Sequence, residues 1–405
     1  MNTPHRSFSV VICVYTEDRW EDILAAVDSV RRQSLPALEI LLVVDHNAAL
    51  LERLGREYGE RAARREERGE VRTARGEERA ARGEVRVLAN AGPRGLSAGR
   101  NTGIANARGE LVAFLDDDAV AERDWLRFFD EAYENPRVLA VGGRTVPAWA
   151  SGSRPDWFPE EFDWVVGCTY RGLPEGRVRV RNVLGGNASF RRSAFDAAGG
   201  FATGIGRREG DGRPLGCEET ELCIRLAGAV PGAVLLIDDR SVIHHKVPAV
   251  RERFGYFRER AYAEGLSKAL VARSVGTDRG LESERRYTTR VLPAGVVRGV
   301  RDAVAVRGRR AARPGGLGRA GAIVTGVTAA AAGYLVGRFR SRGGSVTFSS
   351  GPIEWEGAES RAEAPGAEGP GSSPPGGSPQ DAPGPRSPRS PGSGSGPTSP
   401  REAAV

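Results

Sequence analysis

Three adjacent carboxylates, Asp116, Asp117 and Asp118, follow directly on the apolar run of residues 109–115. The run has the length and composition of a buried strand, so it delivers the three acids together at the end of that strand. Ionised carboxylates this close repel one another, and their placement is favourable if a divalent cation or a cationic partner lies among them. Oxygen ligands of this kind suit Mg²⁺ or Mn²⁺. The alternative is an acidic turn exposed to solvent.

Glutamates and histidines form two further groups that could do chemistry. Glu218 and Glu219 lie in the first turn of a helix predicted for residues 216–225. Their structural alternative is a favourable interaction with the helix macrodipole, worth about 0.3–1 kcal/mol. His244 and His245 end an apolar run, and in an extended strand they point to opposite faces.

Polar residues also follow two other predicted strands. Residues 8–14 and 38–44 are apolar runs of strand length, and Tyr15 and Asp45 follow them directly. In open parallel sheets, ligands bind at the carboxyl ends of the strands, so these side chains and Asp116–Asp118 could line one crevice. The sequence therefore predicts an α/β protein with a ligand site at this edge of its sheet.

Glycine-rich turns precede two other predicted elements. Residues 90–103 place glycines ahead of a helix, where they allow close backbone approach and where the helix N-terminus could face a diphosphate. The spacing is neither that of a P-loop nor GxGxxG. Residues 183–190 contain a second glycine turn, which leads through Asn187 into a strand-like segment.

The composition indicates which partners the chain can bind and in which cellular compartment it works. The chain of 405 residues has a formal net charge of +7, which comes almost wholly from arginine and suits anionic partners such as phosphates or a lipid surface. We expect no nucleic-acid partner. The four cysteines have no CxxC spacing, which indicates neither a zinc site nor a disulfide framework. The N-terminus runs into a strand without an apolar stretch of signal-peptide length, so we expect a reduced, cytoplasmic catalytic core.

Changes in composition divide the chain into three predicted parts. Residues 1–275 form the catalytic domain, interrupted at 57–86 by a charged, repetitive insertion that has no apolar face. Residues 276–341 form a helical segment, and the Pro/Gly/Ser-rich residues 342–405 are predicted to be disordered. We expect no catalytic role for the insertion or for the tail.

The segment after the catalytic domain has the pattern of a helix at a membrane surface. Residues 287–312 place leucine and valine four apart between arginines, and residues 320–337 carry no charge. The uncharged stretch is barely long enough to span a bilayer, and alanine, glycine and threonine dominate it. We therefore expect peripheral or weakly inserted attachment at the cytoplasmic face of the membrane. Helical packing onto the catalytic domain is the alternative.

Aromatic side chains gather in a loop-rich stretch, residues 147–180. They include Trp149, Trp157, Phe158, Phe162 and Trp164. These rings could contact a sugar or lipid acceptor, or they could pack beneath a lid.

Five segments, in this order, resemble the family 2 glycosyltransferases, which have the GT-A fold. The segments are SVVICVYTEDRW, LLVVDHN, GLSAGRNTGIANARGELVAFLDDD, GGNASFRRSAFDAAGGF and CEETELCIRL. The resemblance covers roughly residues 7–275 and is most specific at the three aspartates and the acidic helix downstream. It implies a nucleotide-binding, mostly parallel central sheet flanked by helices, with the C-terminal helices as an appendage. In such enzymes the first half binds a nucleoside diphosphate sugar and the second half builds the acceptor site.

The resemblance also implies roles for particular residues. The residues that it implies contact the nucleotide are Tyr15, Glu17, Asp45, Arg100 and Asp116. Asp116 and Asp118 form the DxD pair that binds Mn²⁺ or Mg²⁺, and Asp118 is the first choice of metal ligand. His244 takes the position where relatives have a histidine near the metal and the diphosphate. His245 is the alternative for this position. The turn at Gly185, Gly186 and Asn187 supports the donor sugar and the acceptor.

This sequence departs from the family at the catalytic base. Relatives carry a Glu-Asp pair where this chain has Glu218 and Glu219, so Glu219 takes the position of the catalytic Asp and Glu218 remains the alternative. Two later segments, HKVPAVR at residues 245–251 and RAYAEGLSK at residues 260–268, resemble a subgroup that acts on polyprenyl-linked or cell-envelope acceptors.

Together these features predict a metal-dependent inverting glycosyltransferase. Sugar transfer from a diphosphate needs a cation that stabilises the leaving group and a carboxylate that takes the proton of an acceptor hydroxyl. Asp118 and Glu219 supply these two roles, and a base opposite the leaving group gives inversion. The acceptor is a glycan or a lipid-linked molecule. The alternatives are a nucleotidyltransferase or retaining transferase on a similar sheet, and a non-catalytic, membrane-attached protein that binds sugar nucleotides.

Overall fold

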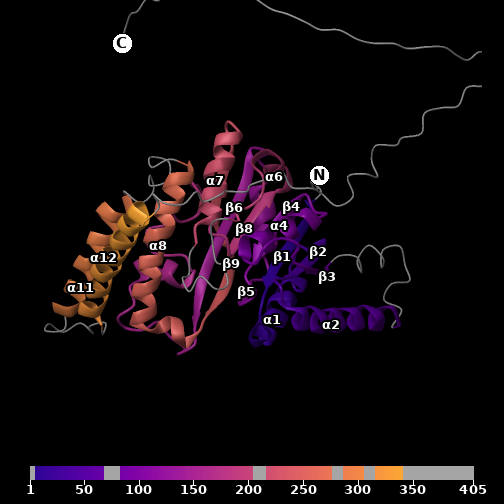
Figure 1. The fold of residues 1–405 in the computed structure, drawn as a ribbon, viewed down its shortest axis with the longest axis horizontal. Helices are drawn as coiled ribbons and strands as arrows, with labels where there is room; N and C mark the ends of the chain where they lie inside the picture. Colours follow the sequence, from indigo (N-terminus) through magenta and orange to yellow (C-terminus); the bar gives the residue numbers. More distant parts are fainter. Residues whose placement is uncertain (1–4, 68–82, 204–215, 276–285, 305–314, 341–405) are drawn as a thin grey trace, which may run out of the picture. The chain divides into compact units, whose positions relative to one another are not determined.

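The computed structural model describes residues 5–67, 83–203, 216–275, 286–304 and 315–340 (Figure 1). The strands are β1 Phe8–Val14, β2 Glu39–Val44, β3 Glu84–Ala89, β4 Leu111–Leu115, β5 Ala119–Ala121, β6 Val138–Trp149, β7 Arg177–Arg179, β8 Asn187–Arg191 and β9 Val234–Val247. The α-helices are α1 Trp20–Arg31, α2 Ala48–Glu67, α4 Leu96–Asn106, α5 Trp125–Ala132, α6 Arg192–Ala198, α7 Glu218–Ala229, α8 Phe254–Val275, α11 Leu292–Val304 and α12 Gly316–Arg340. Shorter helical turns are η1 Glu17–Arg19, η2 Glu160–Val166, η3 Ala249–Glu252 and η4 Tyr287–Val291.

One mixed sheet contains these strands in the order β3-β2-β1-β4-β8-β6-β9-β5, with β7 paired to β9. β3, β2, β1 and β4 run parallel to one another. β8 is antiparallel to both β4 and β6, and β9 is parallel to β6. The N-terminal strands therefore form the parallel part of the sheet, and the later strands extend it as a mixed sheet.

The core of the protein covers both faces of this sheet. On one face, residues of β1, β2 and β4 pack with Ile23 of α1, Leu50 of α2 and Trp125 of α5. On the other face, the alternate residues of the same strands pack with Ile104 of α4 and Leu222 of α7. β2 and β4 are buried at every position, which is why their sequences are continuous apolar runs. The predicted α/β architecture, a largely parallel sheet between helices, is confirmed.

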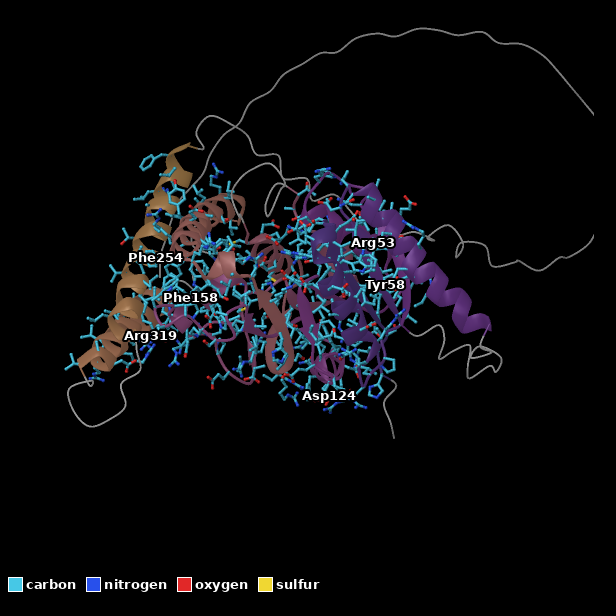
Figure 2. All side chains as sticks on the ribbon, turned by 90° about the horizontal axis from the view of Figure 1, so that it is seen from below. Arg53, Tyr58, Asp124, Phe158, Phe254 and Arg319 are labelled. Atoms are coloured by element: carbon cyan, nitrogen blue, oxygen red, sulfur yellow. The ribbon has the colours of Figure 1, made fainter. Side chains whose placement is uncertain are left out.

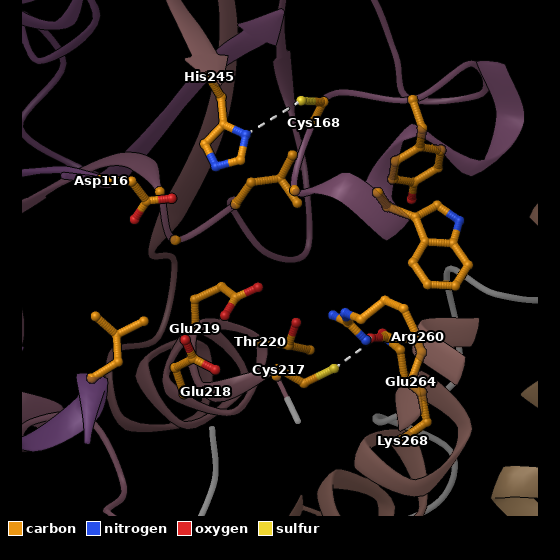
Figure 3. Close-up of a pocket in the computed structure, with 18 of the residues that line it drawn as sticks. Asp116, Cys168, Cys217, Glu218, Glu219, Thr220, His245, Arg260, Glu264 and Lys268 are labelled. Atoms are coloured by element: carbon orange, nitrogen blue, oxygen red, sulfur yellow. Dashed lines mark hydrogen bonds and ion pairs between the residues drawn. The ribbon is translucent and has the colours of Figure 1, made fainter. Parts of the chain in front are cut away.

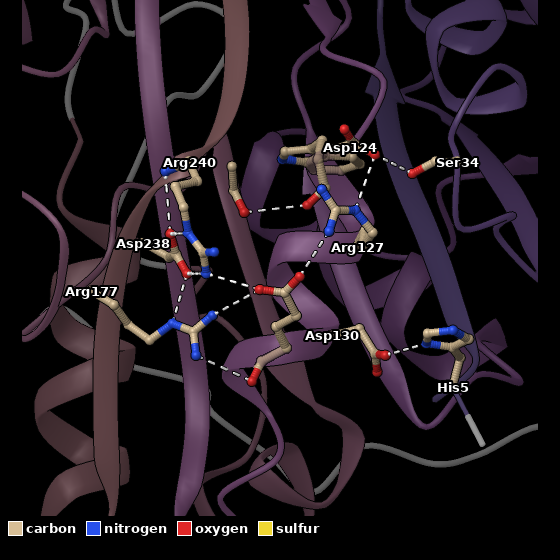
Figure 4. Close-up of polar contacts among 11 residues, drawn as sticks. His5, Ser34, Asp124, Arg127, Asp130, Arg177, Asp238 and Arg240 are labelled. Atoms are coloured by element: carbon tan, nitrogen blue, oxygen red, sulfur yellow. Dashed lines mark hydrogen bonds and ion pairs between the residues drawn. The ribbon is translucent and has the colours of Figure 1, made fainter. Parts of the chain in front are cut away.

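Strand β9 is longer than the sequence predicts because its buried charge is compensated. Residues 234–237 and 242–246 resemble two apolar strands, but the structure contains one continuous strand. Asp238 is fully buried within it and accepts hydrogen bonds from Arg177 Nε at 2.8 Å and from Arg240 Nη2 at 2.8 Å (Figure 4). Burial alone would raise the pKa of Asp238, but the two guanidinium groups lower it below its usual range. These ion pairs allow polar residues to continue the strand.

Three other features of the sheet depend on pairing with β9. The short strands β5 and β7 are not predicted from the sequence, and both pair antiparallel with β9. β6 continues past Gly143 to Trp149 because it pairs with β9 over most of its length.

The aromatic residues of the 147–180 stretch form a core of their own. Phe158 and Phe162 are buried and pack against Phe257 of α8, with ring centroids 5.4 and 5.1 Å apart. Figure 2 shows Phe158 on the side of the protein that carries the C-terminal helices. Packing thus explains why these rings occur in a loop-rich stretch, although Phe162 and Trp164 also line the pocket described below.

The predicted insertion and tail fall largely outside the described residues. Of the insertion at 57–86, residues 57–67 continue helix α2 and residues 84–86 begin β3. Residues 68–82 and the tail at 342–405 lie outside the described ranges.

The uncharged stretch 320–337 belongs to α12, which packs along α8, while α11 packs on α12. Glycines make the first contact close. A Cβ on Gly265 would overlap the carbonyl oxygen of Ala330, and one on Gly333 would overlap that of Tyr262. Within the described ranges, α12 is the one helix long and apolar enough to cross a membrane, with a mean hydropathy of 1.5 over a window that is 28% buried. The helix therefore both packs on the catalytic domain and leaves an apolar face uncovered.

Substitution of Gly333 tests how far the contact between α8 and α12 stabilises the protein. Gly333→Ala is expected to lower the free energy of unfolding by about 1–3 kcal/mol, because the added methyl group must displace the Tyr262 backbone. Gly321→Ala on the same helix is the control, since its Cβ meets no atom within 4 Å. Alanine there should be neutral or stabilising by up to about 1 kcal/mol. Denaturant unfolding measures both variants, and equal stabilities would contradict the close contact.

Candidate active site

A pocket of about 710 Å³ opens at the carboxyl ends of β1, β2 and β4. This is the edge of the sheet at which the sequence predicts a ligand site. Tyr15, Asp45 and Asp116–Asp118, which follow these three strands, all line the pocket. The rest of the wall includes residues of η2, α7, α8, η4 and α12. The pocket therefore joins the parallel half of the sheet to the C-terminal helices.

Two aspartates and a histidine form a group that could bind a metal ion. Ligand atoms of Asp116, Asp118 and His245 all lie within 4.8 Å of one another. Asp118 Oδ1 lies 3.2 Å from His245 Nε2. Burial would raise the pKa of Asp118, but the hydrogen bond with His245 and the charge of Arg19 hold it well below its usual range. The carboxylate ligands of this group suit Mn²⁺ or Mg²⁺.

The middle aspartate has a different environment. Arg19 Nη1 donates a hydrogen bond to Asp117 Oδ1 at 2.5 Å and lies 3.0 Å from Asp118 Oδ2. Burial raises the pKa of Asp117 to about 7 against the lowering effect of Arg19. Oδ2 of Asp117 is buried and has no hydrogen-bond partner among the described residues. Arg19 therefore compensates the charge of this cluster from the turn that follows β1.

Arg100 of α4 links the aspartates to the acidic helix α7. Its side chain is buried, its Nη1 donates to Glu218 Oε1 at 3.0 Å, and its Nη2 lies 3.8 Å from Asp116 Oδ1. Two glycines leave room for this arrangement. A Cβ on Gly185 would come within 2.9 Å of Arg100 Nη1, and one on Gly186 would overlap the carboxylate of Asp116. The glycine turn is thus required by close packing against the two charged side chains.

Glu219 extends into the pocket between the metal-ligand group and α8 (Figure 3). Burial and the neighbouring Glu218 carboxylate raise the pKa of Glu219 to about 8, and Arg100 opposes this rise. A carboxyl group with such a pKa can gain and lose a proton near neutral pH, as a general base must. The two adjacent glutamates therefore differ: Glu218 pairs with Arg100, and Glu219 faces the cavity.

Asp45 and its neighbours shape the mouth of the pocket. Asp45 Oδ1 accepts a hydrogen bond from Asn90 Nδ2 at 2.7 Å, and Oδ2 accepts one from the backbone N–H of Gly95 at 2.9 Å. Gly95 precedes α4 with a φ of 127°, which favours glycine. Tyr15 is half exposed, and the guanidinium of Arg19 lies 5.2 Å from its ring centroid.

The structure places His245 rather than His244 in the metal-ligand group. Successive side chains of a strand alternate between its faces, so His244 points away from His245. His244 is half exposed, and its Nε2 lies 3.0 Å from Glu122 Oε1. The structure thus corrects the first choice made from the resemblance, because the orientation depends on the register of β9 against β5.

Two other residues assigned from the resemblance do not line the pocket. Glu17 lies on η1, and its carboxylate is 3.7 Å from Arg53. Asn187 is fully buried, accepts a hydrogen bond from Trp125 Nε1 at 2.7 Å, and donates to the carbonyl of Ser241 at 3.1 Å. Its amide is therefore used within the core, and the adjacent Gly185 and Gly186 are the parts of that turn in the pocket.

Several pocket residues receive no role from the sequence alone. Arg19 is one of them, and Arg260, Glu264 and Lys268 of α8 are three more. The three residues of α8 recur every four positions, a spacing that places them on one face of a helix. That spacing is a signal that the sequence contains. It gives no indication that the face is turned toward the aspartates.

The chain is similar to known proteins in sequence and in fold. The family described as Glycosyl transferase family 2 matches residues 9–199. A protein of Haloferax volcanii named Glucosyl-dolichyl phosphate glucuronosyltransferase is 34% identical over 264 residues, which are 65% of this chain and 76% of the relative. Among solved structures, the chain is similar to the mannosyltransferase PcManGT from Pyrobaculum calidifontis in complex with GDP-Man and Mn²⁺, with a TM-score of 0.49, 16% identity and coverage of 84% of this chain and 89% of that one. It is also similar to GalNAc-T7 with UDP, GalNAc and Mn²⁺, with a TM-score of 0.45, 16% identity and coverage of 71% and 58%.

The chain belongs to the family 2 glycosyltransferases. The parallel N-terminal half of its sheet and the mixed C-terminal half give it the GT-A fold. It is therefore an enzyme that transfers a sugar, which sets aside the two alternatives of a nucleotidyltransferase and a non-catalytic binding protein.

The raised pKa of Glu219 predicts a pH-dependent contribution to stability. The carboxyl group ionises near its ordinary value of 4.5 in the unfolded chain and near 8 in the folded protein. The cost of its ionisation is therefore absent below pH 4.5, grows as the pH rises and is complete above pH 8. Glu219→Gln, which cannot ionise, is expected to raise the melting temperature at pH 9 by at least about 2 °C and to leave it unchanged at pH 4.

Thermal unfolding at both pH values measures this effect. Glu218→Gln is the matched control, because it removes the carboxylate that pairs with buried Arg100 and should lower the melting temperature at pH 9. An equal effect of Glu219→Gln at pH 4 and pH 9 would contradict the raised pKa.

Proposed function

We propose that this glycosyltransferase moves a sugar from a nucleoside diphosphate donor to a hydroxyl group of a polyprenyl-phosphate-linked acceptor, with inversion and with a divalent metal ion. The observation that carries the proposal is the pairing of two acidic groups across one pocket. Asp116 and Asp118 lie on one side with His245, and Glu219 faces them from α7 (Figure 3). The name of the Haloferax volcanii relative, which contains glucosyl-dolichyl phosphate, supports the acceptor class.

The donor lies in the half of the pocket formed by the parallel strands. Tyr15 and Asp45, at the ends of β1 and β2, contact its nucleoside, because ligands of parallel sheets bind at this edge. Arg100 contributes a buried positive charge near the phosphates. Asp116, Asp118 and His245 would hold the metal ion, which would offset the negative charge of the diphosphate leaving group.

Glu219 acts as the base. Its carboxylate accepts the proton of the acceptor hydroxyl while the hydroxyl oxygen forms a bond to the anomeric carbon and the bond to the diphosphate breaks. The acceptor hydroxyl attacks the sugar from the side of Glu219. The diphosphate leaves from the opposite face, on the side of the aspartates. The product therefore has the inverted configuration. Glu218 positions Arg100 through the 3.0 Å hydrogen bond and takes no proton.

Two substitutions separate the proposed roles of the two acidic groups. Asp118→Asn should abolish the Mn²⁺-dependent part of donor binding, because an amide lacks the charge that holds a divalent cation beside a diphosphate. Glu219→Gln should leave donor affinity unchanged and lower transfer by about 10²–10⁴-fold. Calorimetry with nucleoside diphosphates and Mn²⁺ measures binding, and steady-state kinetics measure transfer. Full transfer by Glu219→Gln would overturn the base, and unchanged metal-dependent affinity in Asp118→Asn would remove that residue from the metal site.

We also propose that the C-terminal helices attach the enzyme to the cytoplasmic face of the membrane. Most of the large apolar side chains exposed in the described ranges lie on these two helices. They are Val297, Val300 and Val304 of α11 and Leu317, Val324, Val327, Leu335 and Phe339 of α12. Arginines flank them at Arg298, Arg301 and Arg338. Apolar contact together with positive charge is the combination that binds an anionic lipid surface.

Substitution of Leu335 and Phe339, which are 54% and 66% exposed, tests this attachment. The double variant Leu335→Glu with Phe339→Glu should bind anionic vesicles at least about tenfold more weakly, because it removes apolar contact and adds negative charge. Arg56→Glu on α2 changes the net charge by the same amount at an exposed site and is the control. Vesicle sedimentation measures both. Equal loss in the two variants would indicate a general charge effect and would contradict attachment through α12.

A further inference from the structure

The turn between β9 and α8 places an arginine inside the protein and apolar residues outside. Arg251 of η3 is 9% exposed and lines the pocket, whereas the neighbouring Val250 and Phe254 are 55% and 44% exposed. The hydrophobic effect favours the opposite arrangement, because arginine is almost never buried unless it is paired. Some other interaction must therefore account for the direction in which this turn points Arg251.

The side chain of Arg251 makes no hydrogen bond and no ion pair with the residues that the structure describes. Its backbone N–H donates to the carbonyl of Pro248 at 2.8 Å, which closes the turn and leaves the guanidinium group in the pocket. A guanidinium group has five N–H donors and no acceptor. Buried donors without partners are unfavourable, and a buried cation is more so. An anionic ligand with oxygen acceptors would remove both costs.

The charge of Arg251 acts on the metal-ligand group. Burial would raise the pKa of Asp118, but its hydrogen bond with His245 and nearby positive charges hold it below its usual range. Those charges belong to His245, Arg19 and Arg251. Arg251 also opposes the rise that burial causes in the pKa of Cys168, whose Sγ lies 3.9 Å from His245 Nδ1. The guanidinium group is thus close enough to influence an ion bound at Asp118.

This charge has opposite effects on the two ligands expected at the site. It attracts the diphosphate of a nucleotide donor, and it repels a divalent metal ion at Asp118. A diphosphate that binds beside the metal ion offsets both positive groups. The metal ion and the diphosphate should therefore each strengthen the binding of the other.

We propose that Arg251 binds a phosphate oxygen of the nucleoside diphosphate and that its charge keeps the metal site weak until the diphosphate is present. This inference rests on the proposed function, in which a nucleotide sugar and a metal ion share the pocket. Removal of the Arg251 charge should strengthen the binding of one ligand and weaken that of the other. Loss of a residue that only supported the fold would weaken both.

The test measures the two ligands separately on the full-length protein. Electron paramagnetic resonance of free Mn²⁺ gives the Kd of Mn²⁺ alone. Calorimetry at saturating Mn²⁺ gives the Kd of the nucleotide, chosen as the tightest ligand of the wild type among UDP, GDP, ADP and dTDP. Arg251→Met should bind Mn²⁺ alone at least about threefold more tightly, because one repelling charge is removed. It should bind the nucleotide at least about tenfold more weakly, the loss expected for one charge-assisted hydrogen bond.

Control variants distinguish this role from a general effect of charge or folding. Arg253→Met removes an exposed arginine two residues away, and neither Kd should change by more than about twofold. Arg251→Lys keeps the charge and should retain the weak binding of Mn²⁺ alone. The gain in Mn²⁺ affinity should be absent when Arg251→Met is combined with Asp118→Asn, because the repelled ion is held at Asp118. The melting temperature of Arg251→Met should stay within about 3 °C of the wild type, since no ion pair is lost.

The outcomes separate this inference from the function on which it rests. If Arg251→Met binds Mn²⁺ alone no more tightly than the wild type does, including no binding by either, the effect on the metal site is overturned. An unchanged Kd for the nucleotide would overturn the phosphate contact. Either result leaves the proposed transfer reaction standing. A wild type that binds none of the four nucleotides with Mn²⁺ would contradict the proposed donor and this inference together.

Discussion

The three aspartates after β4 are compatible with a folded protein because cationic groups from other segments surround them. Arg19 comes from the turn after β1, Arg100 from α4 and His245 from β9. Repulsion among carboxylates this close, two of them buried, would otherwise oppose folding. Because each partner belongs to a different element, the acidic cluster fixes how these elements approach one another. Arg100 extends the constraint to Glu218, so α7 is positioned by the same network.

The start of α7 gives two adjacent glutamates different surroundings. Cys217 precedes the helix with a φ of 74°, a conformation that residues other than glycine rarely adopt. Strain of this kind persists where surrounding contacts determine the backbone, and it is common at functional sites. One such contact is the hydrogen bond from Cys217 Sγ to Glu264 Oε1 at 3.2 Å, which ties the start of α7 to α8. The turn directs Glu218 to Arg100 and leaves Glu219 in the cavity, where burial raises its pKa.

The sequence predicts the parts of the protein that depend on local pattern. β2 and β4 are buried parallel strands and therefore appear as continuous apolar runs, and the polar residues that follow them meet at one edge of the sheet. β5, β7 and the middle of β9 depend on pairing and on the buried ion pairs of Asp238, which no local pattern records. The choice between His244 and His245 depends on the register of one strand, and a shift of one residue reverses it. Asn187 fits the family motif, but its amide is used by the core.

The two sides of α12 constrain how the enzyme can meet a membrane. Gly326 and Ala330 form part of the pocket wall, whereas Val324 and Phe339 are exposed. If α12 crossed the bilayer, α8 would have to accompany it or the wall of the pocket would be lost, because glycines hold the two helices in close contact. α8 carries Arg260, Glu264 and Lys268, and a charged residue at the bilayer centre costs about 2.5–3.5 kcal/mol. A helix that lies in the interface keeps the pocket intact and leaves these charges outside the hydrocarbon. On the proposed function, this arrangement also lets a lipid-linked acceptor reach Glu219 while its chain remains at the membrane surface.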